Sequence, residues 1–436
     1  MLFQHILYLN PEGTIAGPAD IRVEGGKIAA IAERLPLEKG EPSYDGSDRL
    51  LLPAFANPHC HVPMTLLRGQ GEGLPLQEWL SQKIFPFEAL LNEDDMYWGS
   101  LLGIAEMLAS GCVSFSDMYM REKGIIRAVR ETGIKANLCY GTTAFKGEER
   151  FEETDALRET EDILEGAKSI EGQRLIADLS IHGEYTSNEA LVRSTIKKAE
   201  ELGLRMQIHL SETRAEHEAC KKRHSCTPLA YFERCGIFKV PVTFAHAVYL
   251  EDADFALLSR AIREGADISL VHNPSSNLKL GSGFADLKRW FQSGVNVCIG
   301  TDGASSNNNL NVLEELNLAA LLQKGVSGDP AFMPPKTVFS CASEAGFRSQ
   351  GRLDSGRIEE GWRADLSVFN LDLPSMRPSH DLLSNLLFSA PSSALVLTMA
   401  DGRVLYEDGK WLTLDIRRVM REVERIAEEK RRLLNS

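Results

Sequence analysis

The most restrictive feature of this sequence is a long alternation of short apolar runs with amphipathic helical segments, which continues to about residue 350. Counting the apolar runs gives eight strands, near positions 52, 113, 136, 177, 206, 243, 268 and 296. Segments such as NEALVRSTIKKAEELG separate them with a helical period. Strands that alternate with helices form parallel sheets, and eight such units close into a barrel. The sequence therefore predicts an α/β fold built on a (β/α)8 TIM barrel.

Both ends of the chain have a different sequence pattern from the middle. Residues 1–53 alternate β-like runs with turns, and the same pattern returns in ADLSVFNLD and in ALVLTMADGRVLYEDGKWL. We expect these ends to meet in a small β-sandwich domain beside the barrel. The expected domains are residues 1–53 for its first part, 54–355 for the barrel, and 356–436 for its second part with a C-terminal helix.

Composition narrows the class of partner. The formal net charge of the 436-residue chain is -14, and its body contains no Lys/Arg-rich tract, which argues against a nucleic-acid ligand. The eight cysteines form no CxxC pair, which favours a reducing compartment. No signal peptide is evident, and no apolar stretch approaches the roughly 18 residues of a membrane span. We expect a cytoplasmic protein that acts on a small molecule.

Residues able to bind a metal or move a proton lie at the ends of the predicted strands. They are His59, His61, His182, His209, His246 and Asp302. The carboxyl ends of barrel strands meet at one face, so these side chains should converge. Three imidazole nitrogens from His59, His61 and His209, with one oxygen from Asp302, suit zinc or a similar divalent metal. Taken singly, each has another interpretation: the histidines as polar core residues, and the aspartate as a helix N-cap.

Two further residues would give such a centre catalytic chemistry. Glu212 follows His209 by three positions, and a carboxyl group there can carry a proton from water to a ring nitrogen. His246, in VTFAHAV, can orient or deprotonate the water, and Asp302 can combine ligation with proton abstraction. Each also has another interpretation. Glu212 could be a residue at a helix N-terminus that interacts with the helix dipole, and His246 could be a core histidine.

These motifs together resemble a known family. The segments PHCHVPMTLLRG, IHLSET, HNPSSNLKLGSG, GTDGASSNNNLNVLEE and GRIEEGWRADLSVFNLD are similar to the amidohydrolase superfamily, in its branch of methylthioadenosine/S-adenosylhomocysteine and related deaminases. The resemblance covers almost the full length and implies a barrel of the metal-dependent hydrolase type over residues 54–355. It implies His59, His61, His209 and Asp302 as metal ligands, Glu212 and Asp302 as proton carriers, and His246 beside the catalytic water.

The fourth predicted strand indicates how many metals to expect. Superfamily members that hold two metals usually bridge them with a carboxylated lysine at the end of this strand, whereas LIADLSIHGEY offers His182 and no lysine. The sequence therefore predicts one divalent metal, with Zn²⁺ favoured and Fe²⁺ or Mn²⁺ open. By resemblance, His182 is a substrate contact.

The segment WLSQKIFPFE carries the information on substrate. The resemblance implies that Glu88 pairs with ribose hydroxyls and that Trp79 walls the pocket; the alternative is an amphipathic helix with a buried indole. Relatives that accept S-adenosylhomocysteine place an arginine after strand three, where this chain has Tyr140. Arg150, in EERFEE, matches the second arginine of that carboxylate-binding pair.

The predicted function is hydrolytic deamination of an adenine nucleoside to the inosine-type product and ammonia, by a metal-bound hydroxide. Candidate substrates are adenosine, 5'-deoxyadenosine, 5'-methylthioadenosine and S-adenosylhomocysteine. Deamination of guanine, 8-oxoguanine, cytosine or a pterin stays open, as do s-triazine hydrolysis and a binding protein with a structural metal. The resemblance also implies a homo-oligomer, a dimer or a tetramer.

Overall fold

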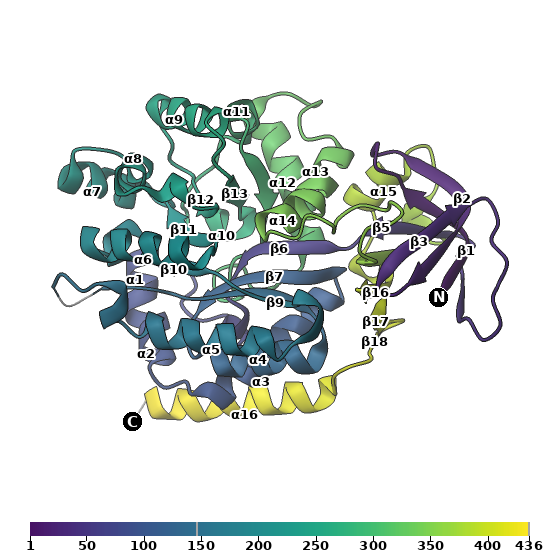
Figure 1. Ribbon diagram of the computed structural model, residues 1–436, viewed down its shortest axis with the longest axis horizontal. Coiled ribbons are helices and arrows are strands. Elements are labelled where there is room, and N and C mark those ends of the chain that lie inside the picture. The colour runs from purple at the N-terminus through teal and green to yellow at the C-terminus, as the bar shows by residue number, and fades with distance from the viewer. Residues whose placement is uncertain (145–146, 435–436) are drawn as a thin grey trace.

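The protein is built around a ring of parallel strands, seen at the centre of Figure 1, in a computed structural model that describes residues 1–144 and 147–434. The ring strands are β6 (Phe55–Cys60), β7 (Cys112–Tyr119), β8 (Lys135–Tyr140), β9 (Leu175–Ala177), β10 (Leu179–Ile181), β11 (Met206–Leu210), β12 (Val242–His246), β13 (Ile268–His272) and β14 (Asn296–Ile299). They pair in parallel in the orders β6-β7-β8-β9 and β10-β11-β12-β13-β14. The predicted barrel is confirmed.

Two junctions turn these two sheets into one barrel. β9 and β10 are the halves of the predicted fourth strand and meet at Asp178, whose N–H donates to the Leu138 carbonyl at 2.9 Å. The next N–H, that of Leu179, donates to the Arg205 carbonyl at 2.9 Å. On the opposite side, the Asp302 N–H donates to the His59 carbonyl at 3.0 Å and links strands eight and one. The ends of all eight strands therefore border a single opening.

The sequence patterns explain why these segments fold as they do. Every residue of β11, β12 and β13 is buried, as expected for strands covered on both faces. The outer helices instead bury one face. In α6 (Glu189–Leu202) the Asn188 side chain caps the first turn by accepting from Leu191 N–H, and Gly203 ends the helix at φ 65°. None of the helices in the described part of the chain is long and apolar enough to cross a membrane.

Most of the helices form the outer layer of the barrel. They are α3 (Glu93–Leu108), α4 (Glu122–Thr132), α5 (Ala156–Lys168), α6 (Glu189–Leu202), α7 (Arg214–His224), α8 (Pro228–Cys235), α9 (Asp252–Arg263), α11 (Leu287–Ser293), α12 (Val312–Ser327), α13 (Pro335–Ala342) and α14 (Glu344–Ser349). The short α10 (Pro274–Lys279) follows β13 at the strand ends. α15 (Leu382–Phe388) lies beside the second sheet (Figure 1).

Both ends of the chain build one nine-stranded sheet beside the barrel, at the right of Figure 1. Its strands are β1 (Leu2–Leu9), β2 (Ile15–Glu24), β3 (Lys27–Ala32), β4 (Ser43–Asp45), β5 (Arg49–Pro53), β15 (Leu366–Asn370), β16 (Leu395–Ala400), β17 (Arg403–Glu407) and β18 (Lys410–Trp411). Antiparallel pairing of β5 with β15 joins the two parts. Phe3, Ile21, Val368 and Leu397 share its apolar core. The predicted sheet domain from both termini is confirmed.

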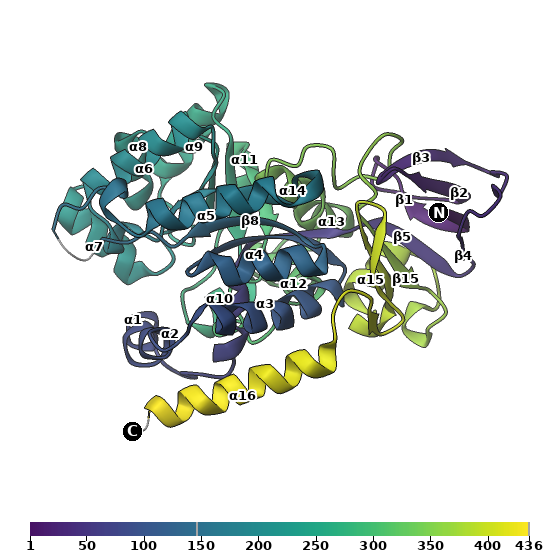
Figure 2. The same ribbon diagram turned by 60° about the horizontal axis from the view of Figure 1, so that its bottom comes forward.

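Two segments cover one side of the barrel near the strand ends. After β6 the chain forms a 3₁₀ turn (Val62–Leu67), then α1 (Leu76–Trp79), a π-helical turn (Leu80–Ile84) and α2 (Phe85–Glu88). The C-terminal helix α16 (Ile416–Leu434) runs along α3 and reaches α2 (Figure 2). A buried ion pair, Lys430 Nζ to Asp95 Oδ2 at 2.9 Å, fixes it there. The last helix of the chain thus packs on the barrel.

Candidate metal centre

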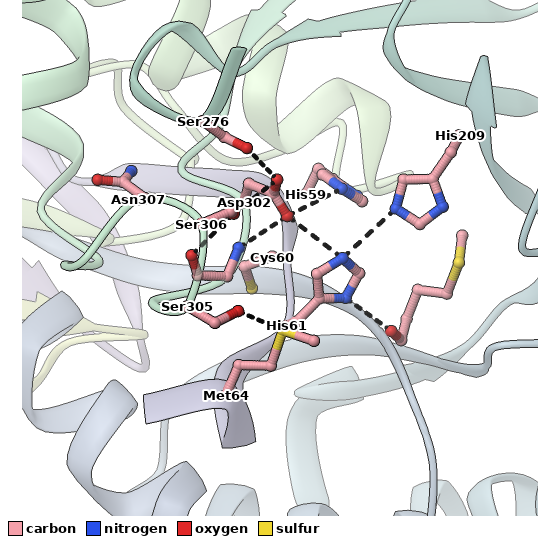
Figure 3. A network of polar contacts seen from close by, with 12 residues as sticks. His59, Cys60, His61, Met64, His209, Ser276, Asp302, Ser305, Ser306 and Asn307 are labelled. Atoms are coloured by element: carbon pink, nitrogen blue, oxygen red, sulfur yellow. Dashed lines mark hydrogen bonds and ion pairs between the residues drawn. The ribbon is translucent and has the colours of Figure 1, made fainter. Parts of the chain in front are cut away.

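Four predicted ligands converge at the carboxyl ends of the strands (Figure 3). His59 and His61 come from the end of β6, His209 from β11 and Asp302 from the loop after β14. Asp302 Oδ1 lies 3.2 Å from His61 Nε2 and 3.7 Å from His59 Nε2. His209 Nε2 lies 3.4 Å from His61 Nε2. The structure therefore brings together all four residues that the sequence proposed.

The remaining ring nitrogens are held by the backbone. His61 Nδ1–H donates to the Met118 carbonyl at 2.8 Å, and His209 Nδ1–H donates to the His182 carbonyl at 2.7 Å. These bonds leave each Nε2 lone pair directed at the shared point, the arrangement that second-shell partners give to metal-bound histidines. His59 Nε2 is buried and has no hydrogen-bond partner among the described residues. An unpaired buried nitrogen is costly unless a cation occupies the point, so the donor set fits a divalent metal.

The electrostatics favour lone-pair donation by two of the histidines. Burial lowers the pKa of both His59 and His209 well below the usual range, which keeps their rings neutral. Burial also acts to lower the pKa of His61, but the hydrogen bond and charge of Asp302 outweigh it and raise it to about 9. A metal ion bound here has to displace that proton.

Asp302 is held as a carboxylate by the loops around it. Its Oδ2 accepts hydrogen bonds from the Ser276 hydroxyl at 2.6 Å and the Ser306 hydroxyl at 3.0 Å, while Oδ1 accepts from Gly303 N–H at 2.7 Å (Figure 3). Burial raises its pKa, but the paired His61 more than offsets this and the pKa falls well below the usual range. Asp302 also adopts a left-handed φ of 60°, a conformation that the surrounding contacts must stabilise.

Two predicted proton carriers lie beside the ligands. His246 Nε2 is 3.9 Å from Glu212 Oε2 and 3.9 Å from Asp302 Oδ2. Its Nδ1–H donates to Asn277 Oδ1 at 2.8 Å, which fixes the ring. Burial raises the pKa of Glu212, so this carboxyl group keeps its proton at a higher pH than an exposed glutamate. The site therefore places an acid, Glu212, and a base, His246, close to the candidate ligand Asp302.

A cavity of about 300 Å³ opens onto this centre. It is lined by predicted substrate contacts, namely Trp79, Glu88, His182 and Glu212, and by Tyr140. Burial lowers the pKa of His182 to about 4, so its ring is neutral at physiological pH. Arg150 is exposed and does not line the cavity, so its predicted role in substrate binding gains no support from its position.

Sequence reasoning missed several residues of the site. Ser276 and Ser306 lie within motifs that were recognised, but nothing in the motifs indicated that their hydroxyls hold Asp302. Tyr119 lines the cavity from the last position of β7. Its place at a strand end is the signal that could have identified it.

Comparison with known proteins agrees with this geometry. Residues 50–405 match the amidohydrolase family. The chain belongs to this family. The resemblance inferred from the sequence is thus confirmed.

Three known proteins are similar to this chain over nearly their whole length. The 5-methylthioadenosine/S-adenosylhomocysteine deaminase of Dictyoglomus turgidum is 38% identical over 416 residues, 95% of this chain and 96% of that protein. The 5'-deoxyadenosine deaminase of Methanocaldococcus jannaschii is 36% identical over 412 residues, 94% and 96% of the two chains. A zinc-bound adenosine deaminase structure from Xanthomonas campestris superposes with a TM-score of 0.89 at 26% identity, covering 99% and 98%.

Proposed function

We propose that the protein is a metal-dependent aminohydrolase that converts an adenine nucleoside and water into the inosine-type nucleoside and ammonia. The observation that carries this proposal is the placement of Glu212 and His246 beside the candidate ligand Asp302, where all three side chains line the cavity. Deamination adds water to a ring carbon and removes the amino group from that carbon, which requires proton transfers at several atoms. The three side chains supply the acid and base groups for these transfers. The names of the similar deaminases support the same reaction.

His59, His61, His209 and Asp302 would hold one divalent ion. Zn²⁺ is our proposal because three nitrogens and one oxygen suit it and because the similar Xanthomonas protein holds zinc. When bound, such an ion lowers the pKa of a coordinated water and polarises the reacting centre. The single ion follows from His182, which stands where a bridging lysine would be needed.

The protein's own groups then move the protons. The buried Glu212 carboxyl would donate its proton to the ring nitrogen next to the amino-bearing carbon. Asp302 would take one proton from the attacking water and deliver it to the departing amine, which leaves as ammonia. The water oxygen stays on the ring as the carbonyl, and the second proton of the water returns to Glu212. His246 Nε2, 3.9 Å from both carboxylates, would hold the water in line. Each step uses a group within reach of its neighbour.

Glu88 and Trp79 favour a nucleoside over a free base as substrate. Both line the cavity from the segment that covers it. A carboxylate accepts hydrogen bonds from two vicinal hydroxyls, which suits a ribose and has no counterpart in guanine, cytosine or an s-triazine.

An ammonia-release screen of the zinc-loaded protein tests the proposed reaction. The panel is adenosine, 5'-deoxyadenosine, 5'-methylthioadenosine, S-adenosylhomocysteine, guanine and cytosine. We expect release from the adenine nucleosides and none from the free bases. Release from guanine or cytosine alone would overturn the nucleoside assignment.

The cavity also predicts which 5'-substituent is preferred. None of the described residues that line it is a lysine or an arginine, whereas Leu76, Leu80, Ile84 and Met120 give it an apolar part. Burying the carboxylate of S-adenosylhomocysteine there without a cationic partner is unfavourable. We expect its kcat/KM to be at least about tenfold below that of 5'-deoxyadenosine or 5'-methylthioadenosine.

Variants at Tyr140 provide the matched test of this preference. Tyr140→Arg places a cation at the cavity wall and should raise kcat/KM for S-adenosylhomocysteine relative to 5'-deoxyadenosine, whereas Tyr140→Phe should leave the ratio unchanged. Equal kcat/KM for the charged and apolar substrates in the wild-type protein would contradict the prediction.

A further inference from the structure

A tyrosine and a glutamate form a buried pair on the cavity wall, where the tyrosine ring lies beside the candidate ligand His61, with 6.1 Å between the ring centroids. The Tyr119 hydroxyl donates to Glu88 Oε1 at 2.6 Å. Both side chains line the cavity, and the two residues are only 5% and 6% exposed. No other side-chain hydrogen bond or ion pair of the Glu88 carboxylate occurs within residues 1–144 and 147–434. One carboxylate oxygen is therefore engaged, and Oε2 is left for a ligand.

Tyr119 lies on a barrel strand, whereas Glu88 lies on a short helix that covers the cavity. Tyr119 ends β7, where it pairs with Tyr140 of β8 and its carbonyl accepts from Gly141 N–H at 2.7 Å. Glu88 ends α2, a helix of four residues in the segment that covers the cavity. The hydroxyl thus ties a carboxylate on a short surface element to a strand of the barrel.

The charge state of Glu88 depends on this contact. Burial raises the pKa of Glu88, and the hydrogen bond from Tyr119 acts in the opposite direction and favours the ionised form. A carboxylate in this environment needs donors to be stable, and two neighbouring hydroxyls of a ligand would supply them.

We propose that Tyr119 is a positioning residue for sugar recognition: its hydroxyl holds one oxygen of Glu88 so that the other meets the vicinal 2'- and 3'-hydroxyls of the nucleoside. This inference rests on the proposed function, because it takes an adenine nucleoside as the ligand. Tyr119 acts through Glu88 and has no part in the proton transfers at the ring.

The test compares Tyr119→Phe with the wild-type protein on adenosine and on 2',3'-dideoxyadenosine. Loss of one hydrogen bond to a charged group should raise KM for adenosine about tenfold and leave kcat within about twofold. KM for the dideoxy nucleoside should not change, because that substrate lacks the hydroxyls that Glu88 would contact. A purely structural role would alter both substrates alike.

Two further variants complete the design. Tyr97→Phe is the matched control, because the Tyr97 hydroxyl donates to Glu131 at the same distance of 2.6 Å on the outer helices, and it should leave both KM values unchanged. Glu88→Gln should raise KM for adenosine alone, and the double variant with Tyr119→Phe should be no worse than Glu88→Gln. Because Glu88→Gln leaves Tyr119 intact, its selective effect on adenosine still tests the sugar contact if Tyr119→Phe folds poorly.

The outcomes separate the inference from the proposed function. Equal effects of Tyr119→Phe on the two nucleosides, a loss confined to kcat, or additive effects with Glu88→Gln would each overturn the positioning role while deamination stands. Failure of the zinc-loaded wild-type protein to bind adenosine in a calorimetric titration would overturn both.

Discussion

Replacing Glu212 by glutamine should leave the metal bound and lower kcat for adenine nucleosides by about 10²- to 10⁴-fold, the range typical of a lost general acid. Glu212 is buried beside His246 and is not among the four ligands, so its charge is not needed to hold the ion. Burial raises the pKa of Glu212, which favours the protonated carboxyl group that delivers a proton to the ring nitrogen. Glutamine keeps the shape and loses the transferable proton.

Metal content and turnover should be measured on the same preparation. Glu218→Gln is the matched control, since Glu218 is an exposed residue of the helix that follows, and it should keep full activity. Wild-type turnover in Glu212→Gln would remove Glu212 from the mechanism. Loss of the metal together with turnover would instead make Glu212 part of the binding site.

Lys135→Met should destabilise the protein by about 3–5 kcal/mol, the cost of removing one partner from a buried ion pair. Lys135 Nζ donates to Asp365 at 2.6 and 2.8 Å and lies 2.8 Å from Asp401 Oδ1. The three side chains are 3%, 0% and 7% exposed, so water cannot replace the lost ammonium. Because Lys135 begins β8 while Asp365 precedes β15, the cluster joins the barrel to the sheet domain.

Urea denaturation followed by circular dichroism measures this effect as a shift of the midpoint. Lys123→Met is the matched control, because the Lys123 side chain is 57% exposed in its pair with Asp162, and it should cost no more than about 1 kcal/mol. Changing both aspartates to asparagine together with Lys135→Met should recover much of the loss. A midpoint that Lys135→Met leaves unchanged would show that the cluster does not stabilise the junction.

The convergence of the four candidate ligands could be predicted because a simple rule places them at the strand ends. Strand alternation predicts a barrel, and strand order then puts His59, His61, His209 and Asp302 on one face without any knowledge of their contacts. The confirmed barrel explains why residues separated by more than 240 positions along the chain meet, as His61 and Asp302 do at 3.2 Å. Here the sequence pattern alone was sufficient.

Contacts between loops could not be predicted in this way. The hydroxyls of Ser276 and Ser306 donate to Asp302, a residue whose backbone adopts a left-handed φ of 60° that the sequence pattern does not indicate. Tyr119 meets Glu88 because α2 folds over the cavity, and periodicity does not fix how such a segment folds. A resemblance assigns a role to Arg150 by position along the chain, whereas its side chain lies outside the cavity.

The central claim is that one metal ion at this centre drives the release of ammonia from an adenine nucleoside. The direct measurement removes metal from the protein with a chelator, adds back zinc in known amounts, and records ammonia release from 5'-deoxyadenosine together with bound zinc. We predict activity that rises with zinc and reaches a plateau at one ion per chain. A plateau that needs two ions per chain, or no ammonia at full zinc occupancy, would contradict the account.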